Sequence, residues 1–301
     1  MNYENIIKQQ KLFTLEDFPS VRKALMDYNE ENCDFNVCNV LSWGLFYKLE
    51  YSYFNGTIIC YNPHSDFLLF PTFNGLLAED IYELFLECRK RHPNVQITAI
   101  SQNNLKKLPD IEKYFTVHND KDWNDYIYIT QDLVNLPGKK LAKKKNLISQ
   151  FHRLYPDNQT REITSSDSNE ILDFCIKWRS FQTNSDEYMT AEAEAIKIIF
   201  NNWDMFPCEG LKLYANGILC SFTVWSPQTT DMATVHFEKS NPNYKGAAQV
   251  INNQIAKEIL KKNFKYINRE QDMGDVGIRQ AKHSYQPYRM LPFYELKLKK
   301  V

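Results

Sequence analysis

Short apolar runs in the first half of the chain are typical of strands, and they are followed by apolar positions with the period of a helix. Two strand-like runs, 46–54 and 57–61, flank Asn55-Gly56. An Asn-Gly pair between apolar runs favours a type I′ hairpin turn, because both central residues of that turn need a positive φ. The run 67–70 predicts a third strand, and the apolar stripe within 78–91 predicts a helix.

The same order of elements returns in the second half of the chain. Strand-like runs at 211–215 and 218–225 flank Asn216-Gly217, a further run covers 233–237, and a helical stripe lies within 247–262. The second half therefore predicts a hairpin, a strand and a helix like those of the first.

Equal spacing supports an internal duplication. Gly75 and Gly246 precede the two predicted helices and lie 171 positions apart. The same offset relates Gln96 to Ile267, each within the strand predicted to follow its helix. Repeats with matching spacing indicate copies of one structural unit, so we expect an α+β fold with two related halves.

The boundary between the halves is expected near residues 155–165, where the segment 155–160 is turn-rich. This places an N-terminal domain at 1–155 and a C-terminal domain at 156–301. A helix predicted over 168–181, capped near Asp167, opens the second domain.

The helix predicted from about 139 to 155 combines a buried stripe with a basic surface. The residues of its predicted buried stripe are Leu141, Ile148, Phe151 and Tyr155. Its clustered lysines are Lys139, Lys140, Lys143, Lys144 and Lys145. Like charges one turn apart cost helix stability, which favours a ligand role over an ordinary solvated face. RNA phosphates would satisfy this surface by counterion release, and anionic lipid headgroups would do so as well.

Composition limits the class of protein. The chain has 301 residues, 43% of them hydrophobic, and a formal net charge of −1, so any affinity for nucleic acid must be local. No apolar run approaches the roughly 20 residues of a membrane span, and residues 1–20 lack the apolar core of a signal peptide. We therefore expect a cytoplasmic protein. The 7 cysteines are scattered and indicate reduced core residues, so no metal site is expected.

A glycine-containing turn opens the helix at 247–262. Lys245, Gly246, Ala247 and Ala248 follow a predicted strand, and helix N-termini with small residues suit phosphate groups. The turn fits the phosphate-binding pattern of GNAT acyltransferases, in which backbone amides hold coenzyme A, although Asn243 replaces the usual anchor. An ordinary strand-to-helix turn is the alternative. The first half has bulky residues after Gly75, so the second copy is favoured.

Five short segments carry most of the candidate chemistry. They are Leu136-Pro137-Gly138-Lys139-Lys140, Val235-His236-Phe237-Glu238-Lys239, Asn268-Arg269-Glu270-Gln271-Asp272-Met273-Gly274, Gly277-Ile278-Arg279-Gln280-Ala281-Lys282 and Ser284-Tyr285-Gln286-Pro287. Through them the chain resembles the soluble catalytic domain of bacterial phosphatidylglycerol lysyltransferases and its free-standing relatives. The resemblance implies a tandem GNAT-like fold, that is, two acyl-CoA N-acyltransferase-like domains that arose by duplication.

The segment around the predicted strand 233–237 suggests an acid–base residue. His236 and Glu238 are expected on one strand face, because alternate residues of a strand point the same way. A carboxylate at this position would deprotonate or orient an attacking amine. Pairing of Glu238 with a neighbouring cation, or exposure to solvent, is the alternative.

The run from 266 to 287 holds the remaining candidates. Arg279 and Lys282 are three residues apart on a predicted short helix and would bind a phosphate or carboxylate together. Asp275 would cap this helix, or form a surface ion pair with Arg279. The resemblance implies that Asp272 and Glu238 act as base or bind an α-amine. It also implies that Tyr285 protonates the leaving group.

Taken together, these residues predict acyl transfer. The catalytic candidates are Glu238, Asp272 and Tyr285, and the substrate-binding candidates are His236, Glu270, Arg279 and Lys282. The resemblance implies an aminoacyl group donated by aminoacyl-tRNA, with the tRNA bound by the basic helix. The acceptor is expected to be a small molecule or peptide with an amine or hydroxyl. A coenzyme-A-dependent N-acyltransferase using acetyl-CoA or another acyl-CoA, and a non-catalytic protein that binds tRNA or a metabolite, are the alternatives.

Overall fold

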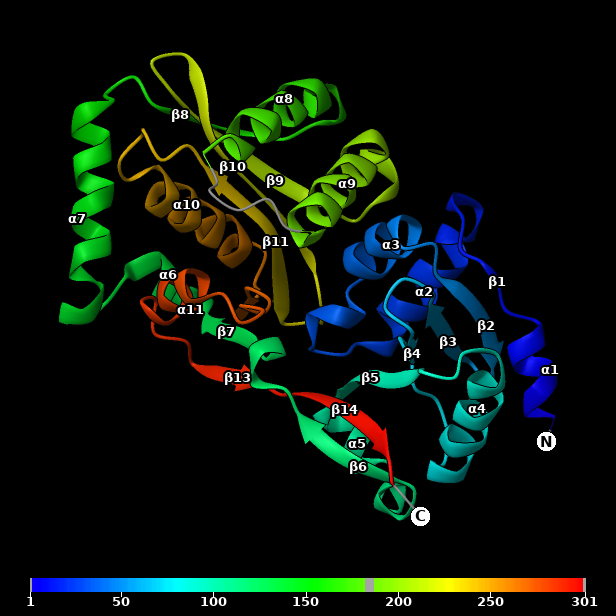
Figure 1. The fold of residues 1–301 in the computed structure, drawn as a ribbon. Coiled ribbons are helices and arrows are strands. Elements are labelled where there is room, and N and C mark those ends of the chain that lie inside the picture. Colours follow the sequence, from blue (N-terminus) through cyan, green and yellow to red (C-terminus); the bar gives the residue numbers. More distant parts are fainter. Residues whose placement is uncertain (1, 182–186, 300–301) are drawn as a thin grey trace. The chain divides into compact units, whose positions relative to one another are not determined.

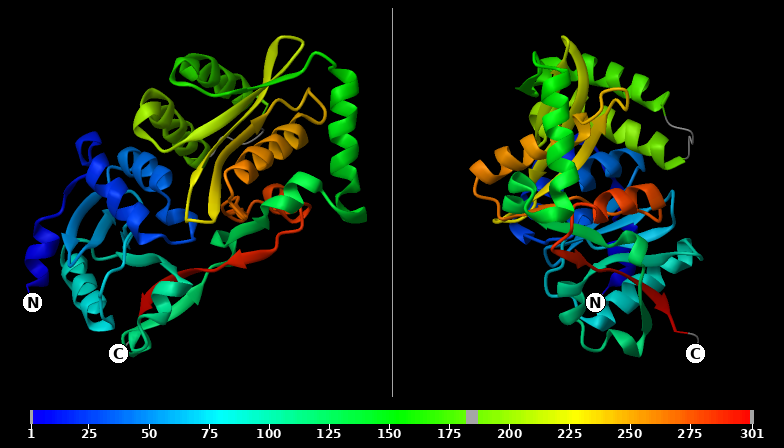
Figure 2. Two further views of the ribbon diagram at one scale, coloured as in Figure 1. Left: turned by 180° about the vertical axis from the view of Figure 1, so that it is seen from behind. Right: turned by 90° about the vertical axis from the view of Figure 1, so that its left-hand side faces the viewer.

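The computed structural model describes residues 2–181 and 187–299. The chain forms two compact units, which are shown in Figures 1 and 2. Unit 1 comprises Met1–Asp125 and Leu291–Val301, and unit 2 comprises Tyr126–Met290. Each unit is built on a mixed sheet of 7 strands.

The sheet of unit 1 has the strand order β1-β2-β3-β4-β5-β14-β6. Its strands are β1 (Lys11–Leu12), β2 (Glu50–Phe54), β3 (Thr57–Asn62), β4 (Phe67–Leu69), β5 (Gln96–Ser101), β6 (Phe115–Asn119) and β14 (Phe293–Leu298). Its helices are α1 (Tyr3–Lys8), α2 (Phe18–Tyr28), α3 (Val37–Phe46), α4 (Ala78–Arg91) and α5 (Gln102–Lys106). Strands β4 and β5 are parallel, and α4 connects them.

The sheet of unit 2 has the order β8-β9-β10-β11-β12-β7-β13. Its strands are β7 (Asp125–Ile129), β8 (Gln159–Glu162), β9 (Glu209–Ala215), β10 (Ile218–Pro227), β11 (Met232–Ser240), β12 (Tyr266–Asn268) and β13 (Arg289–Leu291). Its helices are α6 (Thr130–Asn135), α7 (Gly138–Leu154), α8 (Ser168–Arg179), α9 (Glu187–Asn201), α10 (Ala247–Lys261) and α11 (Val276–His283). Helices α8 and α9 cover one face of this sheet and α10 covers the other (Figures 1 and 2).

The two sheets exchange their last strands. Strand β14, the final strand of the chain, lies between β5 and β6, whereas β7 lies between β12 and β13. Each copy of the repeat therefore contributes one strand to the other sheet. For this reason the compact units do not coincide with the sequence halves 1–155 and 156–301. The division at 155–156 stays a prediction about where the duplicated sequences meet.

Local signals placed most elements well. Asn55, Gly56, Asn216 and Gly217 all have a positive φ, which confirms both type I′ hairpins. Helices α4, α7 and α10 begin and end within one residue of the predicted bounds. The start predicted for the first strand was wrong: Phe46 ends α3, which the side chain of Asn36 caps, and β2 begins only at Glu50.

Helix α7 packs on the core of unit 2 through its apolar stripe. Leu141 and Phe151 are buried, and Ile148 and Tyr155 pack against the same cluster, which confirms the predicted stripe. The cluster includes Val250 of α10. Burial of Leu141 and of Phe151 contributes about 1.5–3 kcal/mol each, so the helix is held despite its run of lysines.

Strands β11 and β12 pair only over a short stretch. Residues 232–234 pair in parallel with 266–268, after which β12 ends and β11 continues to Ser240. Along β11 the register shifts: Phe237 lies opposite Val224 and Val235 opposite Trp225, so His236 is the extra residue of a β-bulge. The bulge interrupts the alternation between His236 and Glu238.

Candidate functional site

A partly buried ion pair links β11 to the end of β12 beyond the point where the two strands stop pairing. The Glu238 carboxylate accepts a hydrogen bond from the Arg269 guanidinium at 3.1 Å and one from the Asn252 side-chain amide at 3.0 Å. The side chains of Glu238 and Arg269 are only 15% and 13% exposed. A partly buried carboxylate needs such partners, because an isolated charge is costly to remove from water.

Tyr285 lies beside this ion pair, just past α11. Its ring centroid is 5.2 Å from the Arg269 guanidinium carbon and 4.2 Å from the Lys144 ammonium. Burial raises the pKa of the Tyr285 phenol; Arg269 acts to lower that pKa and Glu238 to raise it further. The phenol therefore stays protonated at neutral pH, where it is able to donate a proton or a hydrogen bond.

Two buried oxygens near Glu238 have no hydrogen-bond partner among the residues that the structure describes. They are the amide oxygen of Asn252 and the hydroxyl of Thr223, which lies directly across from Glu238 on β10. The amide orientation of Asn252 is fixed, because a flipped amide would turn its oxygen toward the Glu238 carboxylate. The free oxygen of Asn252 is thus an acceptor that a substrate N–H or O–H would satisfy.

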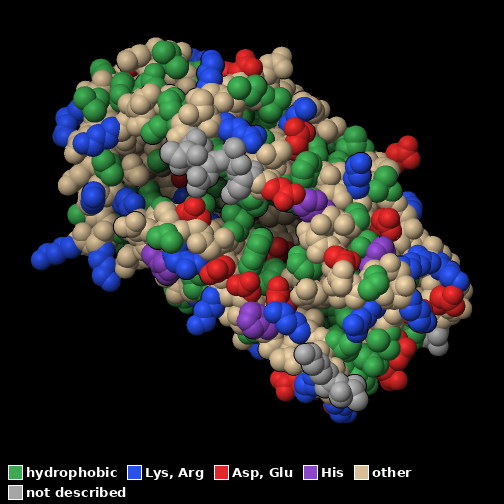
Figure 3. Space-filling model, in the orientation of Figure 1, with side chains coloured by type: hydrophobic (Ala, Val, Ile, Leu, Met, Phe, Trp, Pro, Cys, Tyr) green, Lys and Arg blue, Asp and Glu red, His purple; other side chains and the backbone are tan. Residues whose placement is uncertain are grey.

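The lysines of α7 divide into two groups. Lys139, Lys140, Lys143 and Lys145 are exposed, and in Figure 3 basic side chains gather along the edge where α7 lies. Lys144 is only half-exposed because it lies over Tyr285. The sequence carried a signal for this: Lys144 falls three residues after Leu141 and four before Ile148, on the apolar stripe.

His236 and Glu270 form a separate group. The His236 imidazole contacts the Ser226 hydroxyl at 2.8 Å through Nε2 and the Glu270 carboxylate at 2.9 Å through Nδ1. Glu270 has a φ of 58°, a strained backbone conformation for a residue that is neither glycine nor asparagine. The structure thus brings together the predicted residues His236 and Glu270, while Glu238 has different partners.

Asp272 is enclosed by donors. Its carboxylate accepts hydrogen bonds from Arg279 at 2.6 and 2.9 Å, from the Tyr126 hydroxyl at 2.5 Å and from the Gly274 amide at 2.9 Å. Burial acts to raise the pKa of Asp272, but the hydrogen bonds from Arg279 and Tyr126 outweigh burial and lower it to about 2. A carboxylate with this pKa is a weak base, so the contacts favour an anchoring role.

The two cations of α11 have different surroundings. Arg279 forms the bidentate pair with Asp272 and keeps 39% of its side chain exposed. Lys282 donates hydrogen bonds to the backbone carbonyls of Arg269, at 2.6 Å, and Gln271. The Asp275 side chain accepts a hydrogen bond from the Ile278 amide, which confirms that Asp275 caps the helix. Lys282 thereby fixes the backbone of Arg269.

The glycine turn before α10 is covered by α7. Gly246 has a φ of 94°, and a Cβ added there would lie 2.5 Å from the Leu147 carbonyl oxygen and 3.0 Å from the Phe151 Cβ. The Ala247 amide donates to the Tyr244 carbonyl at 3.0 Å. Of the four predicted turn residues, Gly246 and Ala247 are buried, Ala248 is half-buried and Lys245 is exposed. Backbone of the protein itself therefore occupies one side of the turn.

Sequence reasoning gave no role to three residues of this region. Arg269 lies in the run 266–287, which holds several candidate residues, but no sequence pattern assigned it a role of its own. Asn252 is, with Asn253, one of two polar residues on the buried side of α10, where polar residues of a helix are not expected, and that exception was its only signal. Tyr126 reaches Asp272 from β7, 146 residues earlier in the chain, so no local pattern indicated it.

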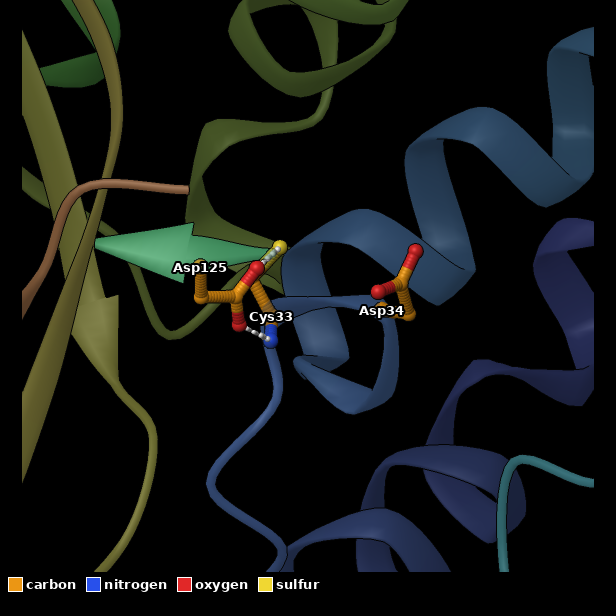
Figure 4. Close-up of side chains that lie close together, drawn as sticks. All are labelled: Cys33, Asp34 and Asp125. Carbon is orange, nitrogen blue, oxygen red and sulfur yellow. Dashed lines mark hydrogen bonds between the residues drawn. The ribbon is translucent and has the colours of Figure 1, made fainter. Parts of the chain in front are cut away.

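A second polar cluster lies in unit 1. Cys33, Asp34 and Asp125 place potential metal-ligand atoms within 4.8 Å of one another. Figure 4 shows the Asp125 carboxylate turned toward Cys33, whose backbone amide donates to it at 2.7 Å and whose thiol donates at 3.2 Å. These hydrogen bonds account for the burial of Asp125 without a metal ion.

Comparisons with solved structures show the fold. A crystal structure of a conserved protein of unknown function from Bacteroides thetaiotaomicron is 29% identical, with a TM-score of 0.87, and the match covers 97% of this chain and 99% of that one. The C-terminal domain of a putative lysylphosphatidylglycerol synthetase from Agrobacterium fabrum is 12% identical, with a TM-score of 0.63 and coverage of 95% and 92%. FemX is 7% identical, with a TM-score of 0.56 and coverage of 95% and 96%. The predicted α+β fold of two GNAT-like domains is confirmed.

Sequence comparisons show the family. An uncharacterized protein of Mycoplasmoides gallisepticum is 24% identical over 206 residues, which is 67% of this chain and 63% of that protein. Within the described parts of the chain, no helix combines the length and apolar character needed to cross a membrane. The family described as phosphatidylglycerol lysyltransferase, C-terminal, matches residues 25–297. The chain therefore belongs to the family of phosphatidylglycerol lysyltransferase C-terminal domains.

Proposed function

We propose that this protein transfers an aminoacyl group from aminoacyl-tRNA to an amine or hydroxyl of a small molecule or peptide. Family and fold support an acyltransferase of the aminoacyltransferase or GNAT type. The observation that carries the finer proposal is the Glu238–Arg269 pair beside the protonated phenol of Tyr285, with the exposed lysines of α7 on the same unit.

The proposed reaction is an exchange of acyl partners. A lone pair of the acceptor nitrogen or oxygen attacks the ester carbonyl carbon of the donor, and the carbonyl π pair moves onto the oxygen. When that pair returns, the bond to the ribose oxygen breaks and its electron pair leaves with the ribose. The acceptor loses one proton and the ribose oxygen gains one, so no co-reactant is needed.

Residues of unit 2 supply the groups for these steps. Tyr285 donates its phenolic proton to the departing ribose oxygen and recovers a proton from the acceptor. Glu238 and the free amide oxygen of Asn252 orient the attacking group by accepting its hydrogen bonds. Such reactions depend on positioning and electrostatic stabilisation more than on a strong protein nucleophile.

The other predicted residues fit supporting roles. Asp272 anchors Arg279, and this partly exposed side chain contacts an anionic group of donor or acceptor. Lys282 holds the backbone of Arg269 in place. His236 and Glu270 form a substrate-binding group at the bulge of β11.

The glycine turn gives a physical reason to prefer an RNA donor over coenzyme A. A GNAT-type turn needs open amides, yet α7 lies against Gly246 and the Ala247 amide is already hydrogen-bonded. The exposed lysines Lys139, Lys140, Lys143 and Lys145 offer phosphate contacts elsewhere. Each such contact contributes through counterion release, so tRNA binding should weaken steeply with salt.

A donor panel tests the proposal. Total tRNA is charged with one labelled amino acid at a time and incubated with the protein and a fraction of small molecules and peptides; transfer is measured as label that leaves the RNA and enters a base-stable product. We expect Glu238→Gln to slow transfer about 100-fold. The matched control is Glu162→Gln, which alters an exposed carboxylate on β8 of the same unit. Transfer from acetyl-CoA with none from any aminoacyl-tRNA would contradict the proposal.

A further inference from the structure

Lys144 differs from the neighbouring lysines of α7 in its contacts and its exposure. Its ammonium lies 4.2 Å from the centroid of the Tyr285 ring, whereas Lys143 and Lys145 are exposed to solvent. Among the described residues, it makes no hydrogen bond or ion pair with a carboxylate. The stacking on Tyr285 offsets part of the cost of partial burial, typically by about 0.5–2 kcal/mol.

The charges around Tyr285 do not balance. Arg269 also lies against this ring, and its charge is compensated by Glu238 at 3.1 Å. Lys144 brings a second positive charge to the same ring with no carboxylate of its own. Burial lowers the pKa of Lys144, and the positive charges of Arg269 and Lys143 lower it further; the carboxylate of Glu238, which is already paired with Arg269, offsets this effect only in part.

We infer that Lys144 is the anion-binding residue of the transferase site and, with Arg269, receives a small oxyanion over Tyr285. The inference rests on the proposed function and assigns to one lysine of α7 a task separate from that of its neighbours. The fitting ligand chemistry is a negatively charged oxygen. Its two sources are the carbonyl oxygen that gains charge when the ester is attacked, and a phosphate at the donor terminus. Donors preorganised toward such an oxygen are worth about 100- to 1,000-fold in rate.

The geometry separates this role from general RNA binding. An exposed lysine that contacts a phosphate releases roughly one counterion when RNA binds. Its removal should weaken RNA binding and reduce the slope of log affinity against log salt concentration by about one. A half-buried lysine on an aromatic ring has a fixed position, so its removal should affect the chemical step or one particular phosphate.

The first experiment needs no knowledge of donor or acceptor. Sulfate serves as the tetrahedral anion, at constant ionic strength set with chloride, and the melting temperature of the whole protein is measured. Lys144→Met keeps the apolar stem over Tyr285 and removes the charge, and Lys144→Arg keeps the charge. Lys265→Met is the matched control, since Lys265 is exposed and precedes β12 of the same unit.

Sulfate should raise the melting temperature of the wild type, of Lys144→Arg and of Lys265→Met, and raise it less in Lys144→Met. An equal rise in the wild type and Lys144→Met, or no rise in the wild type, overturns the inference. Because this readout is independent of tRNA, it can succeed even if the proposed donor is wrong.

The second experiment uses the transfer assay with the donor that the panel identifies. A fall in kcat of about 100-fold in Lys144→Met at unchanged donor KM assigns the reacting carbonyl oxygen as the ligand. A rise in donor KM at unchanged kcat assigns a terminal phosphate. Lys143→Met should instead lower RNA affinity with a smaller salt slope. The same behaviour in Lys144→Met, without a change in sulfate binding, contradicts the inference.

Discussion

Units 1 and 2 repeat the same order of strands and helices from β1 to β5 and from β8 to β12, but differ at the place where their two parallel strands separate. In unit 2, β11 continues past its pairing with β12 to carry His236 and Glu238. In unit 1, β4 ends at Leu69, and the residues that follow include Phe70 and Phe73, both fully buried in the core. One copy fills this space with apolar side chains, and the other lines it with charged and polar groups.

The repeat also shares details of its backbone. Ala99 and Glu270, 171 positions apart, both have a positive φ, of 55° and 58°. At this strained position unit 1 has a small apolar side chain, and unit 2 has a carboxylate held by His236. The comparison indicates that the fold imposes the backbone conformation, while the side chains decide whether a site is present.

The largest expected difference between the two units concerns the glycines before α4 and α10, Gly75 and Gly246. Gly246→Ala should lower the free energy of unfolding by about 3 kcal/mol, because the new Cβ would meet the Leu147 carbonyl oxygen in addition to the strain at φ 94°. Gly75→Ala should cost about 1 kcal/mol, since φ is 69° and nothing lies within 4 Å. Urea denaturation measures both values. Equal losses would show that α7 does not pack on Gly246.

Each unit also contains one carboxylate with a strongly lowered pKa. In both, burial acts to raise the pKa, but hydrogen bonds from Lys11 and Tyr51 lower that of Asp17, and those from Arg279 and Tyr126 lower that of Asp272, to about 2 in each case. The unfolded value is near 3.8, so the stabilisation is fully present above about pH 4 and is lost as the pH falls through about 2.

The Asn variants of these residues should therefore be less stable than the wild type at neutral pH. Their free energy of unfolding should also change less as the pH is lowered. We expect Asp272→Asn to lose about 2 kcal/mol at pH 7. Asp17→Asn should lose less, because the Lys11 side chain is 63% exposed and its interaction with Asp17 is screened by solvent. Unfolding measured from pH 2 to 7 checks both. If the free energy of unfolding of Asp272→Asn depended on pH as steeply as that of the wild type, the result would count against the hydrogen bonds that Asp272 accepts from Arg279, Tyr126 and Gly274.

The smallest expected effect concerns the strained backbone position. Ala99→Gly should raise stability by about 0.5–1 kcal/mol, because glycine adopts a positive φ without steric cost. Glu270→Gly relieves the same strain but removes the contact with His236, so it should gain less. Thermal denaturation compares the two variants. A larger gain in Glu270→Gly would mean that the His236 contact contributes nothing to stability.

Local patterns predicted the elements far better than the site. Asn-Gly turns, apolar stripes and the Asp275 cap are decided by neighbouring residues, and the structure confirms them. The exchange of β7 and β14 depends on strand pairing between distant segments, which no local pattern encodes. The same limit explains why Glu238 was singled out while its partner Arg269 was given no role.

For Lys144, two sequence patterns predicted different positions. Its spacing from Leu141 and Ile148 placed it on the buried stripe, but its membership in a run of lysines suggested the exposed surface. When charge and periodicity disagree, the backbone geometry of the helix decides where a side chain lies, and here it places the lysine over Tyr285.

The most direct test of the proposed site in unit 2 is a single-turnover transfer rate for two matched tyrosine variants. Tyr285→Phe removes the proposed proton donor of unit 2, and Tyr61→Phe removes a buried hydroxyl of unit 1 that donates to Asp66 at 2.9 Å. We predict a fall of about 100-fold or more for Tyr285→Phe and a rate near that of the wild type for Tyr61→Phe. An unchanged rate in Tyr285→Phe, or an equal loss in both, would contradict the claim that the site lies in unit 2.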